Sequence, residues 1–404
     1  MTDSITKIQN CRLIRDGQIV HDDVLFIQSG KIVDAQSHFY RMGSKPSKII
    51  DAQGLIIAPG YIDVQINGAF GVDFSNWVGE EKMRENIDIV AKELLRFGCT
   101  SFAPTIVSSS PEIYHKVLPL LKPRKGNKNN GSEILGAHVE GPFICQDKSG
   151  AHPKELLVDA PKGFADIARV YGITETENPS IRIITVAPEL EGIQNLFKKF
   201  IELGMTVSIG HSCALVEQAE RAVESGARFI THLFNAMQQF HHRDPGIIGL
   251  LSTTHLSRPY YGLICDGIHV HPNSVKLAYS AHPSGVVLVT DAVGAMGLPP
   301  GEYKIGTAKI RKIDDYRVEV IDNGRLAGSV VSISECVRNF KKFTGCSIVE
   351  AVEAATKHPA ELLGIENRKG TLSYGADADL IFLDDDLNVI RCFISGEEVD
   401  IGST

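Results

Sequence analysis

Val207-Ser-Ile-Gly-His211-Ser opens the stretch of sequence from which the fold can be predicted, and Ala227-Arg-Phe-Ile-Thr-His232-Leu-Phe-Asn235-Ala-Met237 closes it. Both segments are short, apolar and β-branched, as buried parallel strands tend to be. Between them, apolar residues recur at helical spacing and stop at a glycine that suits a helix C-terminus: Leu215, Ala219, Ala222, Val223 and Gly226. The stretch therefore predicts a strand–helix–strand unit.

Each strand of this unit ends in a histidine, His211 or His232. A right-handed crossover brings both strand ends to the same edge of a parallel sheet. Two imidazoles at the carboxyl edge of such a sheet favour a metal site. The alternative is a pair of hydrogen-bonded polar histidines, and we favour the metal because both residues stand at the functional ends of their strands.

The composition is that of an ordinary globular protein and limits the class of partner. A chain of 404 residues with 43% hydrophobic and 22% charged residues can form one large domain and a smaller one. Its net charge of −8 argues against general binding to nucleic acid or to anionic membranes. We expect a cytoplasmic protein, because there is no apolar signal segment or membrane span and the eight cysteines are scattered.

Strand and helix patterns alternate from Tyr61 onward, which is typical of a (β/α)8 barrel of the TIM type. The predicted strands lie near residues 61–68, 100–105, 134–142, 181–188, 207–212, 227–237, 260–269 and 286–291. Helices are predicted over 80–97, 111–121, 194–203, 213–226, 274–281, 334–343 and 348–363, and hairpin-like β structure over 301–323.

The two ends of the chain have a different pattern, with β segments and no helices between them. We expect residues 1–57 and 370–404 to build one small β-sandwich domain together. Residues 58–369 would then form the barrel.

A third candidate ligand, Glu140, ends the strand that contains His138. Two imidazoles and one carboxylate suit Zn²⁺ or a similar divalent ion, with water completing the site. Asp291 ends the last barrel strand, where its carboxylate could take a proton from water and pass it to a leaving group. Alone, an aspartate in this place is more often a helix N-cap or a partner in a salt bridge.

Gln65 and Asn67 end the first barrel strand. A His-x-His pair there would support a second metal, whereas amides are poor ligands for Zn²⁺. The sequence thus predicts one metal ion per chain, with these amides contacting substrate or water. Arg243, in the polar loop His241-His-Arg-Asp-Pro-Gly, is a candidate for gripping a phosphate, because its planar fork matches phosphate oxygens.

Four motifs are similar to those of the N-acetylglucosamine-6-phosphate deacetylase family of the amidohydrolase superfamily. They are His138-Val-Glu-Gly-Pro-Phe, Gly210-His-Ser, Thr231-His-Leu-Phe-Asn-Ala-Met and Val289-Thr-Asp-Ala. The segment Tyr61-Ile-Asp-Val-Gln-Ile-Asn-Gly-Ala-Phe-Gly-Val-Asp-Phe resembles the animal form of the family. The resemblance extends from about Ile56 to the segment that begins at Gly375.

This resemblance implies Glu140, His211 and His232 as metal ligands and Asp291 as the catalytic acid and base. It implies the phosphorylated amino sugar as substrate, with glucosamine 6-phosphate and acetate as products, and His152 beside the metal in stabilising the oxyanion. Further implied substrate contacts are Ala151, His152, Asn235, Ala236, Arg243, Asp266, Gly267, Ile268, His269, Leu326, Ala327 and Gly328. It also implies a homodimer in which Arg243 reaches the neighbouring site.

Two alternatives stay open at this stage. A cyclic-amide hydrolase of the dihydroorotase type would be expected to carry His-x-His in place of Gln65 and Asn67. A catalytically inactive assembly protein with this fold would be expected to have lost some of Glu140, His211, His232 and Asp291, yet all four are present.

Overall fold

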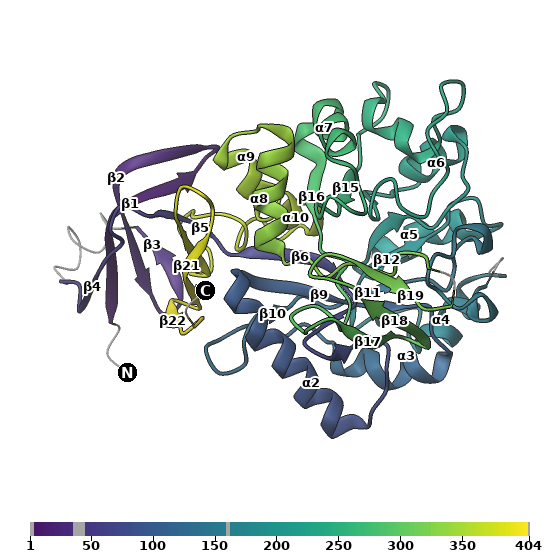
Figure 1. The fold of residues 1–404 in the computed structure, drawn as a ribbon, viewed down its shortest axis with the longest axis horizontal. Coiled ribbons are helices and arrows are strands. Elements are labelled where there is room, and N and C mark those ends of the chain that lie inside the picture. Colours follow the sequence, from purple (N-terminus) through teal and green to yellow (C-terminus); the bar gives the residue numbers. More distant parts are fainter. Residues whose placement is uncertain (1–3, 35–44, 159–161, 323, 403–404) are drawn as a thin grey trace.

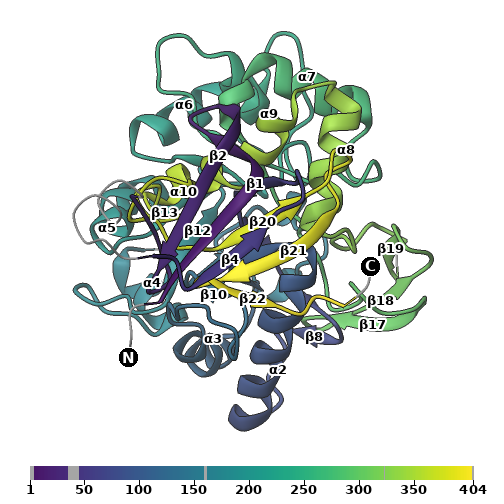
Figure 2. The same cartoon turned by 90° about the vertical axis from the view of Figure 1, so that its left-hand side faces the viewer.

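The computed structural model describes residues 4–34, 45–158, 162–322 and 324–402. Figure 1 shows a large body of strands and helices and, at one side, a sheet built from both ends of the chain. Figure 2 looks onto that sheet and shows purple strands from the start of the chain and yellow strands from its end in the same sheet.

Eight parallel strands form the barrel, as the alternating sequence pattern predicts. They are β6 (Tyr61–Ile66), β9 (Cys99–Val107), β11 (Ala137–Glu140), β12 (Ile181–Val186), β13 (Thr206–Ile209), β14 (Phe229–Ile230), β15 (Tyr260–Leu263) and β16 (Val286–Leu288). Each pairs with the next in this order, and short β10 (Glu133–Ile134) adds to β9. A bridge between Ile66 and Ala292 joins the first strand to the segment after the last one, so the (β/α)8 prediction is confirmed.

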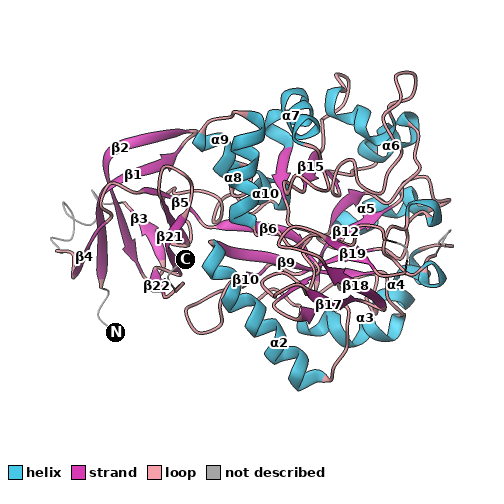
Figure 3. Cartoon of the chain, in the orientation of Figure 1, coloured by secondary structure: helices cyan, strands magenta, loops and turns pink. Residues whose placement is uncertain are grey.

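Helices surround these strands in Figure 3. They are α2 (Glu80–Glu93), α3 (Pro111–Val117), α4 (Phe164–Tyr171), α5 (Phe197–Glu202), α6 (Val216–Glu224), α7 (Pro272–Ala281), α8 (Ile333–Thr344), α9 (Ile348–Glu353) and α10 (Lys357–Leu363). Short 3₁₀ turns lie at Leu94–Phe97, Leu118–Leu120, Gln146–Lys148, Lys154–Leu156, Ile193–Leu196, Gly246–Ser252 and Pro283–Gly285.

The helix predicted over 348–363 is in fact two helices, α9 and α10. Pro359 explains the break, because it lacks the N–H that a continuous helix would donate to the carbonyl of Ala355. In α10 the same proline stands in the first turn, where that N–H is not needed.

The chain ends form one mixed sheet in the order β22-β21-β20-β5-β1-β2-β3, with β4 beside β1. The strands are β1 (Ile5–Arg15), β2 (Gln18–Gln28), β3 (Lys31–Val33), β4 (Lys48–Asp51), β5 (Ile56–Pro59), β20 (Leu380–Leu383), β21 (Val389–Ile394) and β22 (Glu397–Val399). Strand β5 pairs with both β1 and β20 and so joins the two ends. The expected β domain built from both chain ends is confirmed and consists of this one sheet in the described residues, while the domain limits at 57 and 370 stay a prediction.

Alternation along β5 separates two apolar cores. Ile56 and Ala58 pack into the barrel core, whereas Ile57 faces a second cluster that includes Leu25 and Phe382. Because successive side chains of a strand point to opposite faces, this one strand fastens the small sheet to the barrel.

The segment expected to be hairpin-like is a three-stranded antiparallel sheet, formed by β17 (Gly301–Ile305), β18 (Ala308–Lys312) and β19 (Val318–Val320). Residue 323, at the end of that expected segment, lies outside the described residues. A two-stranded ribbon, β7 (Gly68–Ala69) and β8 (Val72–Asp73), follows β6. In the part of the chain that the structure describes, no helix has the length and apolarity needed to cross a bilayer.

A buried ion cluster ties the C-terminal segment to the barrel. The Lys369 ammonium is 4% exposed and contacts Glu133 at 2.9 Å, Asp377 at 3.3 Å and Asp379 at a shorter distance. Lys31, which is 40% exposed, contacts Asp377 at 2.6 Å. Arg368 also contacts Glu133 and Asp377, whereas Lys369 is the one cation in contact with Asp379 among the described residues. Removing Lys369 therefore leaves a buried carboxylate unpaired in a medium of low dielectric, which is far more costly than losing a solvated pair.

Replacing Lys369 with Met should therefore lower the free energy of unfolding by about 3–5 kcal/mol. Lys31→Met removes a cation from the same cluster at its solvated edge and should cost less than about 1 kcal/mol. Urea denaturation of both variants would measure the difference. Equal losses would contradict a special role for the buried ammonium.

Candidate active site

The proposed site residues stand at the ends of barrel strands in an uncommon backbone conformation. Glu140 ends β11, and His211, His232 and Asp291 follow β13, β14 and β16. The φ angles of the last three are 49°, 29° and 48°. Residues other than glycine rarely adopt such angles, and they persist where the surrounding structure enforces them, often at active sites. The turns bring all four side chains into one pocket.

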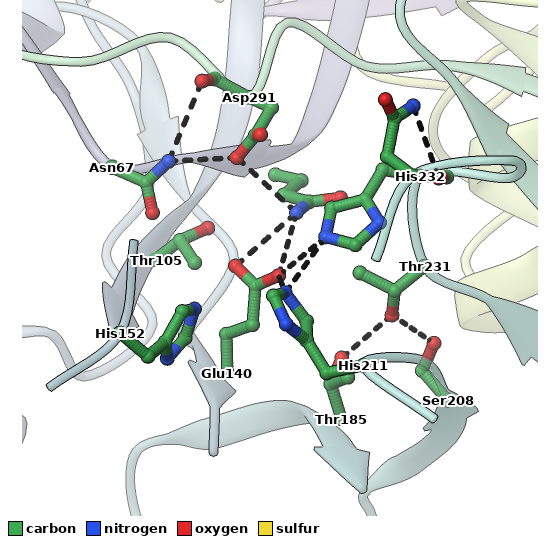
Figure 4. A network of polar contacts seen from close by, with 12 residues as sticks. Asn67, Thr105, Glu140, His152, Thr185, Ser208, His211, Thr231, His232 and Asp291 are labelled. Atoms are coloured by element: carbon green, nitrogen blue, oxygen red, sulfur yellow. Dashed lines mark hydrogen bonds and ion pairs between the residues drawn. The ribbon is translucent and has the colours of Figure 1, made fainter. Parts of the chain in front are cut away.

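Three of these side chains meet at one point, as Figure 4 shows. The Oε1 atom of Glu140 lies 3.0 Å from Nε2 of His211 and 2.9 Å from Nε2 of His232. The two Nε2 atoms are 3.0 Å apart. All three side chains are buried.

The hydrogen bonds around His211 show that this point requires a positive charge. Its Nδ1 lies 2.7 Å from the carbonyl oxygen of Lys148, which can only accept, so Nδ1 carries the proton. A neutral His211 then turns the lone pair of Nε2 toward Glu140. Two acceptors at this distance repel each other unless a cation lies between them. Consistently, the Glu140 carboxylate raises the pKa of His232 although burial alone would lower it.

A divalent metal ion fits this demand. Tetrahedral Zn²⁺ with donors at about 2.0–2.1 Å needs donor atoms about 3.3 Å apart, close to the separations of these three atoms. Nitrogen and carboxylate oxygen are donors that Zn²⁺ accepts. Two buried acceptors nearby, Oε1 of Gln65 and Oδ1 of Asn67, have no hydrogen-bond partner among the described residues, which leaves them available to water or substrate. Glu140, His211 and His232 could thus hold a metal.

The amides of Gln65 and Asn67 hold two carboxylates close together. Gln65 donates from Nε2 to both oxygens of Glu140 at 3.2 Å and to Asp291 at 3.3 Å. Asn67 donates to the same oxygen of Asp291 at 2.7 Å. Burial, and then the charge of Glu140, raise the pKa of Asp291 to about 6. A carboxyl group with such a pKa can accept and return a proton near neutral pH.

His152 lies beside this cluster but offers a different atom to the pocket. Glu140, His152 and His211 have ligand-type atoms within 4.8 Å of one another, so His152 is a second candidate for the third ligand. However, the backbone N–H of Ser108 donates to its Nδ1 at 3.2 Å. Burial, and then the neighbouring His211, lower the pKa of His152 to about 3, so the ring is neutral. Its proton is therefore on Nε2, which can donate a hydrogen bond but has no lone pair for a metal.

The pocket of about 160 Å³ brings together most of the residues that the sequence analysis selected. Those lining it are Asn67, Glu140, Ala151, His152, His211, His232, Asn235, Ala236, His269, Asp291, Leu326 and Gly328. Asp266 lies behind the wall and orients His269 through a contact of 2.6 Å between Oδ2 and Nδ1. Gln65, Gly267, Ile268 and Ala327 also lie outside the lining.

Arg243 is not in the pocket. Its side chain is exposed and makes no hydrogen bond or ion pair within residues 4–34, 45–158, 162–322 and 324–402. Arg243 therefore makes no contact with the pocket of its own chain. It could contact substrate only in the site of a second subunit.

Sequence reasoning missed Val107, Gly150 and Ile305, which also line the pocket. Val107 and Ile305 are ordinary apolar strand residues in the sequence. Val107 pairs with Glu140 in the β9–β11 register, and this pairing could have indicated that Val107 lies at the pocket. His138, in contrast, is a buried structural histidine, because both its ring nitrogens are engaged, by the Val64 carbonyl and the Thr185 hydroxyl.

Comparison with known proteins agrees with this geometry. Residues 56–399 match the amidohydrolase family, and the chain belongs to it. Membership of this family implies a divalent metal ion. The chain is 46% identical over 399 residues to the N-acetylglucosamine-6-phosphate deacetylase of Danio rerio, covering 98% of this chain and 96% of that protein.

Two more distant relatives extend the comparison. An N-acetylgalactosamine-6-phosphate deacetylase of Escherichia coli is 31% identical over 352 residues, with 87% of this chain and 90% of that protein covered. The crystal structure of N-acetylglucosamine-6-phosphate deacetylase from Thermotoga maritima superposes with a TM-score of 0.81 at 30% identity, covering 98% of this chain and 99% of that chain.

The proton positions separate His152 from the three candidate ligands. His211→Ala and His232→Ala should each lower the metal content of the purified protein well below one ion per chain, since three protein ligands leave little redundancy. His152→Ala should keep the metal. Elemental analysis with circular dichroism as a fold control measures both. Metal loss in His152→Ala together with full metal in His232→Ala would show that His152, and not His232, is the third ligand.

Proposed function

We propose that this protein is a metal-dependent hydrolase that converts N-acetyl-D-glucosamine 6-phosphate to D-glucosamine 6-phosphate and acetate. The observation that carries the proposal is the convergence of Glu140, His211, His232 and Asp291 in one pocket at the carboxyl ends of the barrel strands. The substrate is supported by relatives of that activity at 46% identity over nearly the whole chain. In amino-sugar catabolism the protein would act in the cytoplasm.

Glu140, His211 and His232 would hold one divalent ion, and the ligand types favour Zn²⁺. When bound, such an ion supplies Lewis acidity, which activates water and polarises a carbonyl group. The amides at Gln65 and Asn67 support a count of one, because they donate hydrogen bonds to carboxylates and are poor zinc ligands.

Asp291 is the proposed proton carrier. Its Oδ1 accepts from the Asn67 and Gln65 amides, which fix the carboxylate at the edge of the pocket. With the pKa raised to about 6, it can take the proton of the attacking water and then give a proton to the departing sugar amine. Proton transfer to the nitrogen is required, because an amine leaves far more readily than its anion.

His152 would stabilise the oxygen of the acetyl carbonyl as negative charge develops there. Its Nε2–H is oriented before the substrate arrives, since the Ser108 backbone and hydroxyl contact Nδ1. A donor fixed in this way costs no reorganisation during the reaction. Ala151, Asn235, Ala236, His269, Leu326 and Gly328 would surround the sugar.

Acetate release from the phosphorylated sugar tests the proposal directly. Protein with one bound metal should release acetate from N-acetylglucosamine 6-phosphate, react poorly with unphosphorylated N-acetylglucosamine, and lose activity after chelation. The galactosamine epimer belongs in the same assay, because one relative is named for it. No acetate from any of these substrates would overturn the proposal and favour the inactive or cyclic-amide alternatives.

Asp291→Asn should retain metal and fold but lose about 10²–10⁴ in turnover, the usual worth of one general acid or base. Steady-state rates and metal analysis of the same preparation measure this. Near-normal turnover with metal retained would assign proton transfer to another group.

We also propose that the protein is a homodimer in which Arg243 grips the phosphate in the neighbouring subunit's site. The side chain is exposed and lies outside the pocket of its own chain, which supports an action across an interface. A positive group is needed for a dianionic phosphate, since the chain as a whole carries a net charge of −8.

Arg243→Ala should lower kcat/KM for the phosphorylated sugar by about 10- to 150-fold, the worth of one charge-assisted hydrogen bond. The loss should nearly vanish for N-acetylglucosamine itself, and an equal loss on both substrates would contradict phosphate recognition.

The sharing of sites has a separate test. Mixing Arg243→Ala chains with Asp291→Asn chains should restore activity, because one site of each mixed dimer would be intact. If the subunits exchange and no activity returns, Arg243 acts within its own chain.

A further inference from the structure

A pair of cysteines lies beside the candidate active site and outside its pocket. The Cys145 thiol donates to the sulfur of Cys213 across 3.4 Å. Both residues are partly exposed, whereas the other six cysteines are buried. Nothing in the proposed hydrolysis uses either thiol.

The backbone around the pair holds His211 from two directions. The N–H of Cys145 donates to the carbonyl oxygen of His211 at 2.9 Å, and the carbonyl of Lys148 accepts from its ring at 2.7 Å. Cys213 follows His211 by two residues. Segment 145–148 therefore fixes both the backbone and the ring of His211. The contact between the two cysteine sulfurs joins this segment to the residues that follow His211.

Glu189 fixes the other side of the pair. Its two carboxylate oxygens accept from the N–H of Cys213 at 2.5 Å and from the hydroxyl of Ser212 at 2.6 Å. Glu189, Cys145 and Cys213 also have donor atoms close enough for a metal. Because both oxygens of Glu189 are already engaged, a bond between the two sulfurs needs less rearrangement than a second metal.

We propose that Cys145 and Cys213 form a reversible disulfide with a hydroperoxide as oxidant, and that this bond slows the loss of the metal. The second half of the proposal rests on the proposed role of His211 as a ligand. A disulfide has a sulfur–sulfur distance of about 2.05 Å, so the two sulfurs must approach by about 1.4 Å. The cross-link joins segment 145–148 to the residues after His211 and so suppresses local opening of these two segments, through which a ligand would leave the metal.

The oxidation balances with the hydroperoxide alone. One thiol loses its proton and its sulfur attacks a peroxide oxygen; the O–O bond breaks, and the proton goes to the leaving oxygen. A sulfenic acid and an alcohol, or water for hydrogen peroxide, are formed. The second thiol sulfur attacks the sulfenic sulfur, the S–S bond forms, the S–O bond breaks, and water leaves with the thiol proton. Two thiols and one hydroperoxide thus give one disulfide, one alcohol and one water, and two electrons pass from sulfur to oxygen.

Mass spectrometry of the metal-loaded full chain tests the first half. After hydrogen peroxide treatment and alkylation of the remaining thiols, the protein should have lost two hydrogens and yield a linked Cys145–Cys213 peptide, with reversal by dithiothreitol. Cys145→Ser and Cys213→Ser should not form the link. Cys346→Ser is the matched control, because Cys346 is the most exposed of the other six at 9%, and it should behave as the unchanged protein. Separate oxidation of the two sulfurs without a link would overturn the proposal.

Metal transfer to a chelator tests the second half. The oxidised protein should lose metal about threefold or more slowly than the reduced one, because local opening limits release. It should also unfold about 5 °C higher, since the bond closes a long loop. Cys213→Ser should show neither change under the same peroxide treatment.

Equal rates of metal loss in the linked and reduced proteins would overturn the metal-retention claim. A second metal ion that is bound by the reduced protein and lost in Cys213→Ser would show that the two cysteines form a metal site and not a disulfide. Failure of the proposed hydrolysis would appear as absent acetate release while the linked peptide still formed, so the two failures are distinguishable.

Discussion

The carboxylate of Glu140 between two imidazoles is the interaction on which the site depends. With Nδ1 of His211 bound to a carbonyl, a neutral ring turns the lone pair of Nε2 toward Glu140, so the close contact requires a positive charge. Backbone turns with positive φ force the approach of His211 and His232. The barrel thus keeps two imidazoles and one carboxylate close together in a buried place, which is the arrangement that the proposed metal site requires.

Below the cluster, the barrel interior contains a chain of hydrogen bonds that keeps the strand ends in place. Thr185 contacts the hydroxyl of Thr231 at 2.7 Å, and Thr231 contacts Ser208 at 2.5 Å. His138 continues this chain through the Thr185 hydroxyl. Figure 4 shows these hydroxyls in a row beside His211 and below His232. Because the members of such a network are satisfied by one another, they resist rotation and give the turns that carry His211 and His232 a rigid base.

Much of this arrangement could be predicted from the sequence, because its parts follow local rules. His211, His232, Glu140 and Asp291 each come at the end of a β-branched apolar run, and parallel strands bring such ends together. The split of the helix near Pro359 was also foreseeable from the missing N–H of proline.

Other features depend on contacts between distant residues. The proton position on His152 is set by Ser108, which is 44 residues away in the sequence. Ile305 reaches the pocket from the tip of a separate three-stranded sheet, which no periodicity in its own segment indicates. For Arg243, the sequence suggests a phosphate contact, whereas the structure shows an exposed side chain outside the pocket of its own chain. Local patterns thus locate strand ends well, and they say little about which loop crosses above them.

The position of β5 in the small sheet has a consequence for how the protein is made. This strand lies between β1, near the start of the chain, and β20, near its end. While the ribosome synthesises the intervening barrel, the edge of β5 that will receive β20 has no partner strand. An unpaired edge invites pairing with other chains, and the exposure lasts for most of translation. The sheet can therefore be completed only after the last strands are made, and truncations that remove these strands should favour aggregation over simple unfolding.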